Sequence, residues 1–371
     1  MVVKFKHWIN DLPEYIAGRT IEEIKSKYNL TEVYKLASNE NIFGPCKQVK
    51  DFIKNYSGEI NYYPDSDCRE IRQKIGENFK ISPENIIMGD GTDQIIEMIC
   101  DCFISPGDNA VIADPTFLIY EKATLKCGGN VKKIPLKNFR HDLEKMVNTI
   151  DSKTRLFFIT NPHNPAGTNI KKAEFEQVLN DVDKNVLIVI DEAYCEYLPE
   201  DENINSIDKV FKYDNLITLR TFSKIYGLAG LRIGYGIAGA DIISGLNKIR
   251  LPFNVSSIAQ KAAVVALENN WYVSEIKDRI LKEKEKFYSV LNDAKIEYIK
   301  SYSNFILIKT GAGNLKIVEE LLKRGFIVRP GENLGVSGYI RVTVSTPEIN
   351  DKFLDAFTNV YKSYYRYTEN K

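Results

Sequence analysis

Short apolar runs alternate with segments of helical period through the middle of the chain, residues 85–237. Six runs rich in Val and Ile predict strands at Asn85–Met88, Asn109–Ala113, Leu156–Thr160, Val186–Ile190, Leu216–Leu219 and Ile233–Ile237. Strands that are apolar at nearly every position are typical of a sheet buried on both faces. Intervening stretches predict helices at Gln94–Phe103, Phe117–Cys127 and Lys172–Val182. This alternation predicts an α/β fold with a mostly parallel mixed sheet between helices.

The pattern changes after about Pro252. Residues Val255–Asn292 predict one long helix, and we expect its run of mixed charges, Lys282–Lys286, to form a solvent-exposed face. The last part of the chain predicts an α+β unit, with strands at Asn304–Ile308, Phe326–Val328 and Tyr339–Val344 and helices at Leu315–Arg324 and Glu348–Tyr365.

A length of 371 residues suits two domains. We expect a large domain over residues 34–254 and a smaller α+β domain over residues 255–371. The N-terminal segment 1–33, which includes a helical stretch at Thr20–Tyr28, is expected to pack with the small domain.

Composition excludes several classes of partner. The chain has 50 basic and 50 acidic residues, so a broad nucleic-acid or membrane surface is not expected. Met1–Tyr15 has no continuous apolar stretch and therefore predicts neither a signal peptide nor a membrane span. The six cysteines form no C-x-x-C pair, which is typical of reduced thiols in a cytoplasmic protein, and we expect no metal site. His7 and His141 are expected to have no catalytic role.

Polar residues follow four of the predicted strands, at Gly89–Asp93, Asn161–Gly167, Asp191–Tyr194 and Arg220–Lys224. In open α/β sheets, ligands bind at the carboxyl ends of the strands. We therefore expect these four segments to form one site.

Each segment has a chemical and a structural interpretation. The glycine-bearing turn before Thr92 suits a phosphate group, although a capped helix start has the same pattern. Asp191 follows five apolar residues, so it is either half of an ion pair or the counter-ion of a protonated ring nitrogen. Lys224 is either a surface lysine or an amine nucleophile. Arg232 has the donor geometry that recognises phosphate.

Pyridoxal 5'-phosphate (PLP) accounts for all of these segments together. Its aldehyde suits Lys224, and its pyridinium nitrogen suits Asp191. Its phosphate suits the turn at Gly91–Asp93 with Ser223 and Arg232, and its ring oxygen suits Asn164 and Tyr194.

An ordered set of motifs carries a family resemblance across nearly the whole chain. The motifs are Leu36–Asn41, Tyr63–Asp65, Gly91–Asp93, Asp114–Phe117, Asn161–Gly167, Asp191–Tyr194, Arg220–Lys224, Gly230–Tyr235 and Tyr339–Thr343. The sequence resembles the fold-type I PLP-dependent aminotransferases and, within them, the histidinol-phosphate aminotransferases. The resemblance implies a large PLP-binding domain and a smaller α+β domain.

The resemblance also implies roles for individual residues. Lys224 would form the Schiff base and carry protons, Asp191 would keep the ring nitrogen protonated, and Tyr194 would bond the ring oxygen. The other residues implied in cofactor binding are Thr92, Asp93, Phe117 (stacking on the ring), Asn164, Thr221, Ser223 and Arg232.

Substrate and subunit contacts follow from the same resemblance. Arg341 would bind the substrate carboxylate and Arg329 its side-chain phosphate, with Asn41 also at the substrate. Tyr63 would reach the cofactor phosphate of the neighbouring subunit, which implies a homodimer. The chain departs from the family at Phe117, where tyrosine is common, and at His163, Ala166 and Ile42, which leaves the substrate less defined than the cofactor.

The function that the resemblance implies is amino transfer between L-histidinol phosphate and 2-oxoglutarate, in L-histidine biosynthesis. An aromatic amino-acid aminotransferase and a threonine-phosphate decarboxylase, a lyase on a similar scaffold, remain alternatives. A regulatory module with a PLP-type fold would need a DNA-binding domain, for which residues 1–33 are too few.

Overall fold

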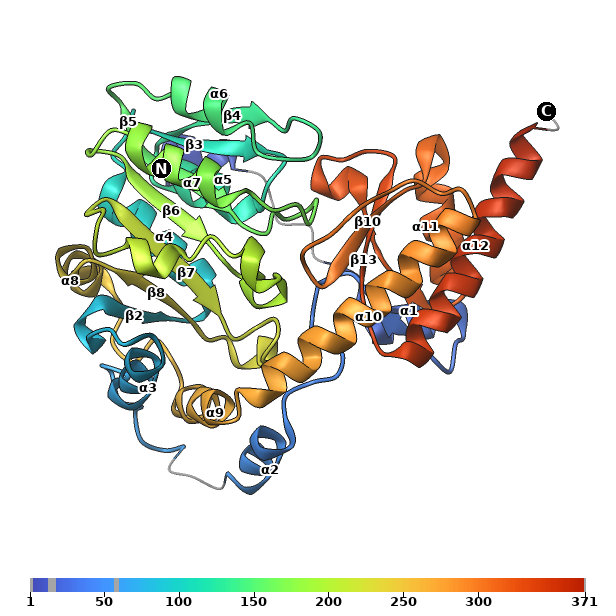
Figure 1. Cartoon of the computed structure of the whole chain (residues 1–371), viewed down its shortest axis with the longest axis horizontal. Coiled ribbons are helices and arrows are strands. Elements are labelled where there is room, and N and C mark those ends of the chain that lie inside the picture. Colours follow the sequence, from blue (N-terminus) through green and yellow to red (C-terminus); the bar gives the residue numbers. More distant parts are fainter. Residues whose placement is uncertain (1–2, 13–17, 57–59, 370–371) are drawn as a thin grey trace.

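The computed structural model describes residues 3–12, 18–56 and 60–369, which form two lobes joined by the long helix α10 (Figure 1). The larger lobe holds a seven-stranded sheet in the order β2-β8-β7-β6-β5-β3-β4. Its strands are β2 (Ile86–Gly89), β3 (Asn109–Asp114), β4 (Asn130–Pro135), β5 (Thr154–Thr160), β6 (Leu187–Asp191), β7 (Leu216–Thr221) and β8 (Gly234–Ala238). In this sheet β8 runs opposite to the other six strands, which all point the same way, so the predicted mostly parallel sheet is confirmed.

Helices cover both faces of this sheet because alternate strand residues point to opposite sides. Ile188 and Ile190 of β6 pack with one group of helices, and Leu187 and Val189 pack with the other group. The first group is α2 (Lys47–Asn55), α3 (Arg69–Phe79), α6 (Leu143–Asn148), α7 (Lys172–Asp181) and α9 (Ser257–Glu268). The second is α4 (Gly91–Phe103), α5 (Leu118–Lys126) and α8 (Ala240–Ile249).

The smaller lobe is an α+β unit built on a four-stranded sheet in the order β12-β13-β10-β9, whose paired strands are antiparallel. These strands are β9 (Tyr298–Ile299), β10 (Phe305–Lys309), β12 (Arg329–Pro330) and β13 (Tyr339–Thr343). The helices of this lobe are α10 (Trp271–Asp293), α11 (Asn314–Lys323) and α12 (Pro347–Glu369). In the same lobe, β1 (Tyr34–Lys35) and β11 (Phe326–Ile327) form a separate pair of parallel strands.

The N-terminal segment contacts both lobes. Helix α1 (Ile21–Tyr28) buries Ile24 in the core of the small lobe. The short helix η1 (His7–Asp11) instead contacts α5 of the large lobe, where Trp8 Nε1 donates a hydrogen bond to the Lys126 carbonyl at 3.0 Å. The expected packing against the small domain therefore describes α1 and not η1.

The stretch expected as one long helix consists of two helices, α9 and α10, so that expectation was wrong. Helical geometry is interrupted at Asn269, whose side chain donates back to the Val265 carbonyl at 2.8 Å. Asparagine is a weak helix former because its side chain competes for backbone hydrogen bonds. Since α9 packs into the large-lobe core, the large lobe extends past the expected boundary at residue 254.

The run Lys282–Lys286 is not a uniformly exposed face, so that interpretation was also wrong. Glu283 and Lys284 are buried, because α10 is covered here by α12 and by the segment around Ser301. Lys284 Nζ donates to the Ser301 carbonyl at 2.8 Å, and Glu283 accepts a hydrogen bond from Asn350 at 2.8 Å. Burial lowers the pKa of Lys284 from 10.5 to about 8.

We predict that Lys284 makes stability depend on pH. Between about pH 8 and pH 10.5 the folded chain binds fewer protons at Lys284 than the unfolded chain, so the free energy of unfolding rises with pH in this window. In Lys284→Met this rise should be absent. Urea denaturation across the window measures it, with Lys282→Met as the exposed control. Identical pH trends in the two variants would contradict the prediction.

Candidate active site

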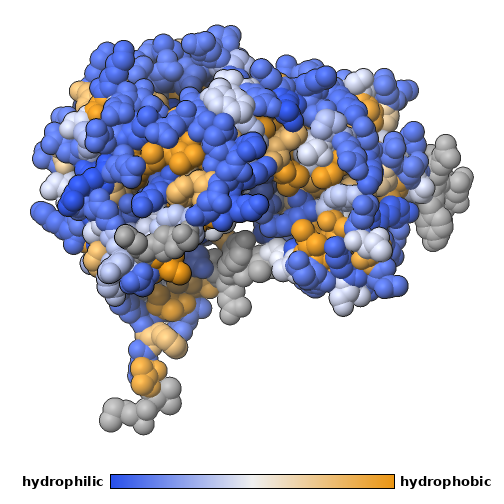
Figure 2. Space-filling view, turned by 90° about the horizontal axis from the view of Figure 1, so that it is seen from below, coloured by the Kyte–Doolittle hydropathy of each residue, from blue (hydrophilic) through white to orange (hydrophobic). Residues whose placement is uncertain are grey.

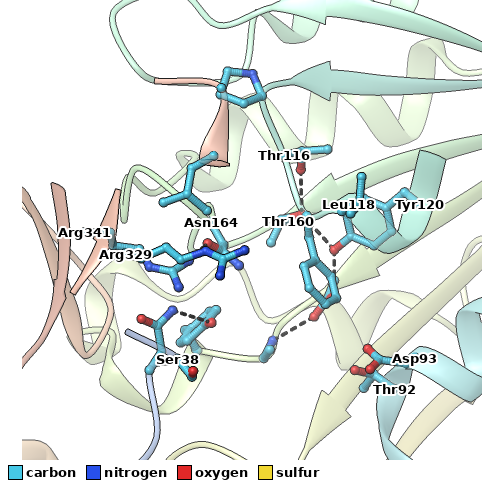
Figure 3. Close-up of a pocket in the computed structure, with 18 of the residues that line it drawn as sticks. Ser38, Thr92, Asp93, Thr116, Leu118, Tyr120, Thr160, Asn164, Arg329 and Arg341 are labelled. Carbon is cyan, nitrogen blue, oxygen red and sulfur yellow. Dashed lines mark hydrogen bonds between the residues drawn. The ribbon is translucent and has the colours of Figure 1, made fainter. Parts of the chain in front are cut away.

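The carboxyl ends of β2, β5, β6 and β7 meet at one edge of the large sheet, facing the small lobe. There the chain encloses a cavity of about 410 Å³, lined by residues of both lobes (Figure 3). Residues from the strand-end segments line it together with others from the small lobe. Its lining includes Thr92, Asp93, Phe117, Asn164, Asp191, Tyr194, Thr221, Ser223, Lys224, Arg232, Arg329 and Arg341.

One corner of the cavity has the donors of an anion site. Helix α4 begins at Gly91, which has a φ of +70°, and it points the N–H groups of its first turn at this corner. Arg232 Nη1 lies 3.5 Å from Ser223 Oγ, and Arg232 Nη2 lies 3.4 Å from the Asp93 carboxylate. Burial raises the pKa of Asp93, while the Arg232 cation opposes the rise. Backbone N–H groups, a hydroxyl and a guanidinium here suit phosphate oxygens.

Asp191 is a buried carboxylate at the end of β6, with 3% of its surface exposed. The Ala193 N–H donates to Oδ1 at 3.0 Å, and the Tyr120 hydroxyl donates to Oδ2 at 2.7 Å. Burial raises the pKa of Asp191 to about 6, and these two hydrogen bonds oppose the rise. The ion pair at this strand end belongs instead to Glu192, whose Oε2 lies 2.8 Å from Arg220 Nη2. Asp191 is thus left to face the cavity.

Lys224 follows β7 and extends into the same cavity. Its Nζ lies 3.3 Å from the Ser38 carbonyl oxygen and 5.5 Å from the centre of the Tyr194 ring. The Tyr194 hydroxyl accepts a hydrogen bond from Asn39 Nδ2 at 3.0 Å. Because Asn39 supplies that proton, the phenolic proton of Tyr194 remains available for an acceptor in the cavity.

Two arginines of the small lobe also line the cavity. Arg329 of β12 and Arg341 of β13 are register partners on adjacent strands (Figure 3). Arg341 donates to Asn164 Oδ1 at 2.5 Å and to the Ala37 carbonyl at 2.8 Å, which links the small lobe to the loop after β5. Two neighbouring guanidinium groups suit an anionic ligand.

The residues that line this cavity do not include Asn41, which was expected at the substrate, or Tyr63, which was expected at the cofactor of the partner subunit. Asn41 does not line the cavity, and its Nδ2 donates to the carbonyls of Ile225 at 2.7 Å and Gly44 at 3.2 Å. It thereby holds the backbone next to Lys224. Tyr63 is 81% exposed and stacks on Phe253, with ring centroids 4.5 Å apart. Their expected roles in substrate and partner contacts remain predictions.

The structure adds Tyr120, Thr160 and Asn39 to the residues that sequence reasoning selected. All three line the cavity and are buried. Tyr120 lies three positions after Phe117, so the two side chains share one face of α5. This spacing was the only sequence feature that could have indicated Tyr120 as a site residue. Asn39 lies inside the motif Leu36–Asn41 and has a left-handed φ of +57°, which the sequence alone does not reveal.

The chain is similar to known proteins over nearly its whole length. Residues 31–357 match the model of the family "Aminotransferase class I and II". A histidinol-phosphate aminotransferase of Caldicellulosiruptor saccharolyticus is 41% identical over 96% of this chain and 99% of its own length. Another, from a Geobacillus species, is 39% identical over 97% and 99%.

A solved structure is also similar over almost its full length. The crystal structure of histidinol-phosphate aminotransferase from Sinorhizobium meliloti, in complex with pyridoxal-5'-phosphate, superimposes with a TM-score of 0.90. It is 26% identical and covers 98% of this chain and 99% of its own. The chain therefore belongs to the class I and II aminotransferases and, within them, to the histidinol-phosphate aminotransferase family.

We predict that Gly91 is required for the anion corner. A Cβ at this position would lie 2.4 Å from Arg232 Nη2, at a φ that disfavours L-residues. Gly91→Ala should lower the free energy of unfolding by about 1–3 kcal/mol and weaken phosphate binding. Gly230→Ala is the matched control, because a Cβ there meets no atom of the described residues within 4 Å. Chemical denaturation and phosphate titration measure both variants, and equal stabilities would contradict the prediction.

Proposed function

We propose that the chain is a PLP-dependent aminotransferase that moves an amino group between L-histidinol phosphate and 2-oxoglutarate. The observation that carries the proposal is one cavity that joins Lys224, Asp191, the anion corner at Arg232 and the paired arginines Arg329 and Arg341. Membership of the family supports it, as does the PLP in the similar Sinorhizobium meliloti structure.

The chain's own groups fit PLP at each of its polar ends. Gly91 leaves a cradle beside Arg232 that a Cβ would fill, and this cradle suits the cofactor phosphate. Asp191 suits the ring nitrogen, and Phe117 is the aromatic side chain that would cover the ring face. Asn164 and Tyr194 suit the ring oxygen, and Thr221 lies beside Ser223 at the phosphate end. Bound PLP supplies an electron-withdrawing ring that stabilises negative charge on the substrate carbon.

The residues of the chain carry out the proton transfers and hold the charges of the bound groups. Lys224 is the only amine among the described residues that line the cavity, so its Nζ is the group that removes and returns the proton at the amino-bearing carbon. Asp191 stays ionised and holds the proton of the ring nitrogen. Tyr194, with its own oxygen engaged by Asn39, donates its proton into the cavity.

Both substrates of the proposed reaction are anions, and one basic pocket serves both. Histidinol phosphate lacks a carboxylate next to its amino group, so its phosphate is the group that Arg329 and Arg341 would bind. In the second half of the reaction the same arginines would bind carboxylates of 2-oxoglutarate. Crystal structures with each ligand in turn would test this, and two separate anion pockets would contradict it.

A spectral titration tests the proposed function. We predict that L-histidinol phosphate converts the PLP-loaded chain to its aminated cofactor form, and that 2-oxoglutarate reverses the change. Lys224→Ala should slow this conversion about 10³-fold because the proton-transferring amine is lost. Conversion by L-phenylalanine alone would identify an aromatic aminotransferase. Release of carbon dioxide from L-threonine phosphate would identify the lyase.

We also propose that the chain forms a homodimer in which Tyr63 reaches the cofactor phosphate of the partner. Support comes from exposed apolar side chains in two segments that the Tyr63–Phe253 stack joins: Ile60, Tyr62, Tyr63, Leu251 and Phe253. Figure 2, seen from the side of α2 and α9, has hydrophobic patches on an otherwise mostly hydrophilic face. Exposed apolar patches mark interaction surfaces.

Leu251→Glu tests the dimer. A carboxylate in an apolar interface must be desolvated, so we predict that the dimer dissociation constant rises about 100-fold. Sedimentation velocity over a concentration series measures it. Phe211→Glu is the control, since Phe211 is exposed but lies outside the two segments. A monomeric unaltered chain, or equal effects of both substitutions, would count against the proposed interface.

We further propose that the enzyme works in the cytoplasm. All six cysteines are free thiols, and Cys46, Cys68, Cys100 and Cys195 are buried. Buried, unpaired thiols suit a reducing compartment. Separately, none of the helices in the described parts of the chain is long and apolar enough to cross a membrane.

A further inference from the structure

Tyr120 is a buried tyrosine of α5 at the base of the cavity, with 1% of its surface exposed. Its ring stacks on Phe158 of β5, with centroids 4.8 Å apart and planes inclined by 16°. Its other neighbour is Phe117, which meets it edge to face at 5.8 Å. Packing on two sides fixes the position of the ring and therefore of the hydroxyl.

The hydrogen bonds of Tyr120 have one possible direction. Its hydroxyl lies 2.7 Å from Asp191 Oδ2 and 2.9 Å from Thr160 Oγ1 (Figure 3). An ionised carboxylate only accepts, so the single phenolic proton goes to Asp191. Thr160 must then donate to the phenolic oxygen, and Thr116, whose Oγ1 lies 3.4 Å from that of Thr160, donates to Thr160 in turn. The three hydroxyls form a directed row that ends at the carboxylate.

We propose that Tyr120 is a positioning residue, which keeps Asp191 ionised and turned so that its remaining lone pairs face the ring nitrogen of PLP. The inference rests on the proposed function and adds a residue whose hydroxyl acts through Asp191. With Ala193 N–H on Oδ1 and Tyr120 on Oδ2, the carboxylate is held at both oxygens and cannot rotate freely.

The charged groups around Asp191 determine how loss of the Tyr120 hydrogen bond changes the pKa of Asp191. Burial is the largest influence and favours the neutral carboxyl group. Asp93 on α4 acts in the same direction, whereas Lys224 after β7 favours the ionised form. Tyr194, the other titratable group near Tyr120, follows β6. Removing the Tyr120 hydroxyl therefore raises the pKa of Asp191 above about 6, so that the neutral form persists to higher pH.

The test is the affinity of the full-length apo chain for PLP, measured by equilibrium dialysis as a function of pH. Tyr120→Phe removes one oxygen and keeps the ring packing. Tyr197→Phe is the matched control, because Tyr197 is also buried and its hydroxyl has no hydrogen-bond partner among the described residues. Relative to the unaltered chain, Tyr120→Phe should bind PLP about tenfold more weakly near pH 6.5 and about twofold more weakly near pH 9.

The pH dependence separates this role from general damage to the fold. An affinity loss that is the same at every pH, or no loss beyond that of Tyr197→Phe, would overturn the inference. Thr160→Val provides a second variant, since it removes the donor to the phenolic oxygen and should cause a smaller loss with the same pH trend. If the unaltered chain itself failed to bind PLP, the proposed function would fall together with this inference. Binding by the unaltered chain with a pH-independent defect would overturn the inference alone.

Discussion

The carboxylate of Asp191 lies where the apolar interior of the large sheet ends, and most of the site is arranged around it. Four apolar residues of β6 carry the chain through the core, and the next residue is the acid. A carboxylate in such a place is stable as an ion only if donors compensate for lost hydration. Ala193 and Tyr120 provide that compensation from within the chain. The lone pairs of the carboxylate that these two donors leave open suit a cationic group of a ligand.

The parallel strands bring the other polar residues of the site close to Asp191. Because β2, β5, β6 and β7 point the same way, the residues that follow them gather at one edge, although Asp90 and Lys224 are 134 positions apart in sequence. The small lobe closes the site from the other side with residues of β12 and β13. On the proposed function, a cofactor held by the large lobe would face the arginines of the small lobe.

The sequence predicted those parts whose cause is local. The six strands that the sequence predicted are apolar at most positions, and polar residues follow four of them directly in the chain. These strands, and the segments that line the cavity at their ends, could therefore be predicted from local sequence. Strand β4 was missed because it lies at the sheet edge and carries Lys132 and Lys133, which give it no continuous apolar run. Lys284 and Tyr120 depend on tertiary packing, since nothing near either residue in the sequence shows what will cover it.

The Arg341 side chain is already engaged before any substrate arrives. Two of its donors bind the Asn164 side chain and the Ala37 carbonyl, which belong to different segments of the chain. An anion that binds Arg341 therefore replaces existing hydrogen bonds and does not simply add new ones. Its net affinity is the free energy of the new contacts minus that of the contacts it displaces. Such an exchange favours ligands with enough charge to outcompete neutral acceptors. Amines without an anionic group would then be excluded by the hydrogen bonds that Arg341 makes in the ligand-free chain, as much as by the shape of the pocket.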